Sequence, residues 1–94
     1  MEEGVKVFNV TGVPFNFSIT EIKVKKGDKV KINFTNGQGM HDWVVDEFNA
    51  STERINAGSR SRVVFVADKK GTFEYYCSVG KHRANGMKGT FIVE

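Results

Sequence analysis

Apolar and polar residues alternate along most of this chain, and helical periodicity is nearly absent. The alternating runs are rich in β-branched and aromatic residues, which is the pattern of half-buried β-strands. The clearest run is Val30-Lys-Ile32-Asn-Phe34, in which every second residue is apolar. The pattern predicts strands over residues 5–10, 15–19, 21–25, 30–34, 43–45, 62–67, 72–77 and 88–93.

Turn residues separate these runs at short intervals. Pro14 marks a turn or a sheet edge because proline cannot donate to a strand ladder, and Gly27 and Gly71 lie in turn signals. The pattern fails between residues 46 and 60, where we predict an irregular stretch with one helical turn at 50–54. Seven to eight short strands at such spacing predict an all-β fold, an antiparallel Greek-key sandwich.

Length and composition predict one domain that spans residues 1–94, with room for a single core. No apolar run approaches the ~20 residues of a membrane helix, and no signal peptide is visible in this chain. The net charge of +3 comes from Lys and Arg scattered along strands and turns, which favours an ordinary polar surface over nucleic-acid binding. We also expect a monomer, with Trp43 in the core.

One loop concentrates the chemistry. Cys77, His82 and Met87 follow one another in the spacing C-x4-H-x4-M, and the chain has no other cysteine. The second of its two histidines, His41, lies 36 residues upstream of Cys77 at the head of an apolar run. Taken singly, the Cys is a buried thiol, a nucleophile or a ligand. Taken together, two imidazoles, a thiolate and a weak thioether match a mononuclear copper site.

These residues, in this order on this strand pattern, resemble the cupredoxins, the type 1 blue copper proteins. The Tyr76-Cys77-Ser78 entry and the ending that follows Gly86-Met87 are similar to that family as well. The resemblance implies one copper ion per chain, cycling between Cu(I) and Cu(II). It implies His41, Cys77 and His82 as strong ligands and Met87 as a weak axial ligand. It also implies an extracytoplasmic location and electron passage at the exposed edge of the His82 ring.

Two positions depart from the common family pattern. Gly80-Lys81 stands where many members have a proline between Cys and His, which predicts a less rigid loop. Asp42 stands where many have Asn or Ser. Its N–H and that of Val79 are expected to donate to the Cys77 sulfur, and its carboxylate to lower the copper potential.

The basic residues Lys81, Arg83 and Lys88 around His82 predict a positive rim that a redox partner with an acidic face would recognise. The function predicted is therefore electron transfer by a protein that is not an enzyme. A copper carrier or sensor that does not shuttle electrons is the alternative. A reductase or oxidase part would need further histidines for a second copper site, and none remains after the first is filled.

Overall fold

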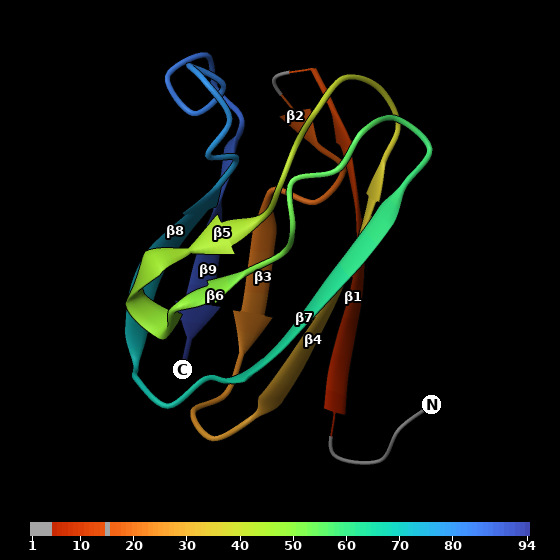
Figure 1. Ribbon diagram of the computed structural model, residues 1–94. Helices are drawn as coiled ribbons and strands as arrows, with labels where there is room; N and C mark the ends of the chain where they lie inside the picture. Colours follow the sequence, from red (N-terminus) through yellow and green to blue (C-terminus); the bar gives the residue numbers. More distant parts are fainter. Residues whose placement is uncertain (1–4, 15) are drawn as a thin grey trace.

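Two β-sheets pack face to face in the computed structural model, which describes residues 5–14 and 16–94 (Figure 1). The first sheet has the strand order β2 (Asn16–Phe17), β1 (Val5–Val13), β4 (Lys29–Asn36) and β7 (Arg60–Val66). The second has the order β3 (Glu21–Val24), β9 (Lys88–Val93), β8 (Gly71–Tyr76), β5 (Val44–Val45) and β6 (Ala50–Ser51). The predicted all-β Greek-key sandwich is confirmed, although short strands raise the number of strands in the described residues to nine.

The strand pairings are mostly antiparallel, with two parallel exceptions. β1 runs parallel to β4 from Val5↔Lys29 to Gly12↔Asn36, and β3 runs parallel to β9. β8 and β9 pair as an antiparallel hairpin, so the long loop between them emerges at one end of the second sheet. Figure 1 shows this loop, in blue, at the same end of the sandwich as the β4–β5 connection, which contains His41, and the β6–β7 connection, which contains Ile55.

The core consists of the inward residues of both sheets, as the alternation predicts. Val30, Ile32 and Phe34 of β4 are fully buried, and Phe91 of β9 packs in the same core. Trp43 is also fully buried, which confirms it as a core residue. Burial of these apolar side chains is the main favourable contribution to folding of the sandwich.

The helical turn predicted at 50–54 is wrong. Ala50 and Ser51 form β6, which pairs with β5, and the helical turn is instead a 3₁₀ segment, η1, at Asp46–Phe48. Asn49 ends this segment in the left-handed conformation with φ 49° and reverses the chain into β6. The reversal escapes a pattern analysis because strands of two residues carry no periodicity.

The strand predicted at 15–19 is shorter than expected. Only Asn16–Phe17 is extended there; Phe15 lies outside the described residues, and Pro14 lies in a turn, as predicted. β1 in turn continues past Val10 to Val13. No helix among the described residues is long and apolar enough to cross a membrane.

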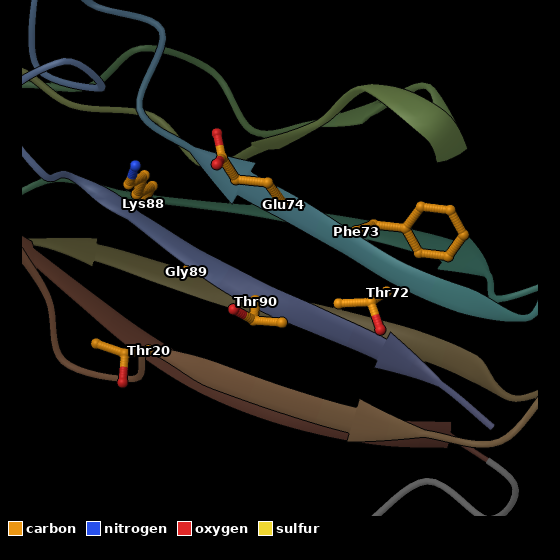
Figure 2. A pocket seen from close by; sticks show the side chains of 7 residues that line it. All are labelled: Thr20, Thr72, Phe73, Glu74, Lys88, Gly89 and Thr90. Carbon is orange, nitrogen blue, oxygen red and sulfur yellow. The ribbon is translucent and has the colours of Figure 1, made fainter.

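An open depression of ≈ 520 Å³ lies on the outer face of the second sheet (Figure 2). Its lining comes from β8, β9 and the segment before β3, and Figure 2 shows the threonine side chains and Glu74 standing on this face. The lining is Thr20, Thr72, Phe73, Glu74, Lys88, Gly89 and Thr90. None of the four candidate ligands is part of it.

Candidate metal centre

The loop between β8 and β9 is closed by its own backbone hydrogen bonds. Cys77 N–H donates to the carbonyl of Met87 at 3.1 Å, so the two ends of the loop lie side by side. Inside the loop, Met87 N–H donates to the carbonyl of His82 at 3.0 Å, and His82 N–H donates to that of Val79 at 3.1 Å. Gly80 has φ 51°, a left-handed conformation that favours glycine. The loop is thus folded back on itself without a proline.

His41 is fixed by a backbone bridge to the segment between β6 and β7. Its N–H donates to the Ile55 carbonyl at 3.1 Å, and Ile55 N–H donates back at 2.9 Å. The buried Asn36 amide donates to the carbonyls of Gly39 and Ile55 at 2.7 and 2.6 Å, which joins both segments. A β-carbon on Gly39 would lie 3.3 Å from His41 Nε2, so glycine leaves room for the ring.

Three of the four predicted site residues meet at the end of the sandwich. His41 Nδ1 lies 3.2 Å from His82 Nδ1 and 3.7 Å from Cys77 Sγ, and His82 Nδ1 lies 3.4 Å from the same sulfur. His41 and Cys77 are buried, whereas His82 is half-buried. These three residues therefore lie close together, as the sequence predicted.

Met87, the fourth residue, is fully buried directly before β9. Its methyl group packs close to β1, where a β-carbon on Gly12 would lie 3.2 Å from Met87 Cε. Its backbone is tied to both Cys77 and His82. Its role as the axial ligand stays a prediction.

Burial shifts the pKa values of Cys77 and His41 in the directions that favour their uncharged forms. Burial raises the pKa of the Cys77 thiol, while N–H donors from Asp42 and Val79 to the sulfur lower it. Both donors were expected from the sequence. Burial is also the main reason that the pKa of His41 is lowered; nearby His82 lowers it further, and the Gln38 backbone and Asp42 act in the opposite direction. A neutral imidazole is the form that binds metal.

Asp42 also anchors the residue that follows Cys77. Its carboxylate accepts the Ser78 N–H at 2.6 Å and the Ser78 hydroxyl, and Arg54 Nε lies 3.8 Å from the same carboxylate. Arg54 Nη2 also approaches the Ser78 carbonyl at 3.5 Å. The sequence indicated Ser78 only through the family resemblance and gave no sign of Arg54, because Arg54 lies in an irregular stretch and no pattern relates it to the loop.

The positive charge of the basic rim predicted around His82 is partly neutralised. Lys81 and Lys88 are exposed. Arg83, in contrast, donates from Nε to Glu74 at 2.5 Å, and its guanidinium lies 3.9 Å from the centroid of the Tyr76 ring. The positive charge of Arg83 is therefore offset by a carboxylate on β8.

Comparisons with known proteins identify relatives of this chain. A family model described as a cupredoxin-like domain matches residues 2–93. Nitrous-oxide reductase of Stutzerimonas stutzeri is 36% identical over 95 residues, which cover 96% of this chain and 15% of the reductase. Copper-containing nitrite reductase of Neisseria gonorrhoeae is 32% identical over 84 residues, which cover 78% of this chain and 21% of that enzyme. The chain thus spans only a small part of these relatives.

Among solved structures, auracyanin A, a blue copper protein from Chloroflexus aurantiacus, has a similar fold. The TM-score is 0.86 at 22% sequence identity, and the match covers 97% of this chain and 100% of the other. Auracyanin from Roseiflexus castenholzii gives a TM-score of 0.83 at 21% identity, covering 94% of this chain and 96% of the other. Identities this low establish the shared sandwich alone.

Proposed function

Since this chain belongs to the cupredoxin-like domain family, we propose that it transfers single electrons through one mononuclear copper ion. His41, Cys77 and His82 would be the strong ligands, and Met87 the weak axial one. The observation that carries the proposal is the triangle of two Nδ1 atoms and one Sγ with edges of 3.2, 3.4 and 3.7 Å. Two imidazoles and a thiolate with a distant thioether form the set typical of electron-transfer copper sites.

The dimensions of the triangle fit a metal ion. A point equidistant from three atoms at these separations lies about 2 Å from each, and metal–imidazole and metal–thiolate bonds measure roughly 2.0–2.3 Å. The chain has one cysteine and two histidines, and this site uses all three. A second copper site of the dinuclear or catalytic kind would need ligands that this chain does not contain.

Copper, when bound, supplies the Cu(I)/Cu(II) couple, and the protein holds the ligands still while the charge changes. The loop ends are joined by the Cys77–Met87 hydrogen bond, and the His41 backbone is held on both sides by Ile55. The N–H groups of Asp42 and Val79 donate to the sulfur and stabilise its thiolate form. A site held in this way rearranges little, which favours fast electron transfer.

Burial of the site favours electron transfer over copper delivery. His41 and Cys77 are each 1% exposed and Met87 is fully buried, so a partner could not exchange ligands with the metal without opening the fold. A carrier site would be more open to solvent. Half-buried His82 offers the route for electrons to a partner.

Titration with Cu(II) followed by visible absorption tests the proposal. We expect an intense thiolate-to-copper band that saturates at one ion per chain and disappears reversibly on reduction. Cys77→Ser should abolish the band while the metal-free fold is retained. A wild-type protein without the band, or a Cys77→Ser protein that keeps it, contradicts the assignment. Loss of copper on each reduction would favour the carrier function.

We further propose that a redox partner with an acidic face docks at the His82 end. Exposed Lys81 and Lys88 support this docking face, although the paired Arg83 makes it weaker than the sequence alone implies. The transfer rate should fall as ionic strength rises, and Lys81→Gln should reduce this salt dependence. Lys26→Gln, in the turn at the opposite end of the sandwich, is the control. A rate that does not respond to salt excludes the acidic partner.

Two remaining proposals concern the setting of the protein. From its family we propose that the protein acts outside the cytoplasm, and we also propose that it is a monomer. Cell fractionation and light scattering test these two points.

A further inference from the structure

Arg83 is the side chain that connects the outer part of the ligand loop to the strand beneath it. Its Nε donates to the Glu74 carboxylate at 2.5 Å, and its guanidinium lies over the Tyr76 ring at 3.9 Å. Both contacts are made to outward-facing residues of β8. The Tyr76 ring is itself fixed, because its hydroxyl donates to Asp46 at 2.8 Å. The guanidinium therefore rests on a ring that cannot turn freely.

The place of these contacts in the chain gives them significance. Arg83 directly follows His82, and Tyr76 directly precedes Cys77. A contact between Arg83 and Tyr76 thus connects the residue after one candidate ligand to the residue before another. The ligating atoms of those two candidates, His82 Nδ1 and Cys77 Sγ, are 3.4 Å apart. The loop also contains Gly80 and Gly86 at φ 51° and 101°, residues that leave an unrestrained loop many alternative conformations.

We propose that Arg83 is a positioning residue, which holds His82 beside Cys77 before any metal binds. This inference rests on the proposed copper site. In this role the Arg83–Glu74–Tyr76 contact restrains the loop in place of the proline that this loop lacks. The Arg83 and Glu74 side chains are half-exposed, at 50% and 37%, so the contact adds little to global stability. Its effect is confined to the loop.

Amide hydrogen exchange of the metal-free protein tests the proposal without copper. The amides of His82 and Met87 report on the loop, because both donate within it. In Arg83→Ala we expect their exchange to accelerate about fivefold, while amides of β4 and β9 keep their wild-type rates. The matched control is Lys23→Ala, which removes another exposed ion pair of the same sheet, with Glu94, at 4.0 Å.

Further variants separate the two contacts and guard against misfolding. Glu74→Gln keeps the side-chain shape and removes only the ion pair, so it should give a smaller acceleration. Arg83→Lys keeps the charge and loses the planar stacking group, so it should restore only part of the protection. If Arg83→Ala does not fold, the loop exchange rates of Glu74→Gln test the proposal instead. Loop exchange in Arg83→Ala or in Glu74→Gln that equals the wild-type rate overturns the proposal.

Measurements on the copper-loaded protein relate the Arg83–Glu74–Tyr76 contact to the metal site. The Cu(II) form of Arg83→Ala should show a broadened or shifted thiolate band and faster copper release to a chelator, by about fivefold, whereas Lys23→Ala should match the wild type. If wild type shows no thiolate band, the copper assignment fails, and the exchange data still decide the role of Arg83. If the wild-type band is present and unchanged in Arg83→Ala, only the positioning role fails.

Discussion

Gly89 offers a direct test of how the hairpin that carries the site is packed. It lies in β9 opposite Tyr75, two residues after Met87. A β-carbon at this position would lie 2.5 Å from the Tyr75 hydroxyl oxygen and 2.6 Å from ring atom Cε1. The Tyr75 ring cannot give way easily. It stacks on Trp43 with 5.0 Å between ring centroids, and its hydroxyl donates to the Ile19 carbonyl at 2.5 Å.

Gly89→Ala should therefore destabilise the protein through steric overlap alone. Overpacking of a core by one methyl group costs about 1–3 kcal/mol, and the closeness of these contacts favours the upper end. Reduced freedom of the unfolded chain returns about 0.4–1 kcal/mol, so we expect a net loss of about 2 kcal/mol. For a domain of this size such a loss lowers Tm by roughly 8–16 °C.

Denaturant unfolding of the metal-free protein measures this loss. Gly37→Ala is the control, because its β-carbon would meet the exposed Val13 side chain at 3.2 Å, which can move aside. The decisive experiment repeats Gly89→Ala in a Tyr75→Leu background, where the ring is gone. The loss should then shrink by at least half. An equal loss in both backgrounds would refute the steric explanation.

Three further predictions concern pH and the site. Burial raises the pKa of Tyr75, so the stabilisation that comes from its neutral phenol is complete below about pH 10. This stabilisation is lost as pH rises through the higher pKa of the folded state. Tyr75→Phe should flatten this alkaline loss when unfolding is measured against pH. Asp42→Asn removes a carboxylate beside the sulfur and should raise the midpoint potential by about 60 mV, equivalent to a tenfold change in the one-electron equilibrium, in voltammetry; an unchanged or lower value would exclude this effect. Gly39→Ala forces alanine to φ +82° and crowds His41, and it should weaken Cu(II) binding at least fivefold in competition with a chelator; wild-type affinity would contradict the crowding.

Much of the fold was predictable from the sequence because long strands bury alternate residues. β4 is the clearest case: Val30, Ile32 and Phe34 point inward as their spacing requires. The hairpin of β5 and β6 was not predictable, because its strands have two residues each and its reversal depends on a single left-handed Asn49. Local pattern carries no information about such short pairings.

The candidate site was also predictable only in part. The loop spacing was enough to suggest Cys77, His82 and Met87, because their residue types are rare in this chain. The contacts of Arg54 with Ser78 and of Arg83 with Glu74 were not predictable. Each depends on the path of a loop over a sheet, and the sequence indicates Arg83 only as part of the basic rim around His82.

The pairing of β5 with β8 has a consequence for assembly of the protein. Cys77 and His82 follow one another in the loop of a single hairpin, whereas His41 joins them only after β5 and β8 have paired through Val44 and Tyr76, which lie far apart in sequence. Pairing of distant segments is slow relative to closure of a local hairpin. Copper present during refolding should therefore meet a two-ligand species first, and such binding to incompletely folded chains reduces the stabilisation that the ion gives to the native state. Adding the metal after folding avoids that species.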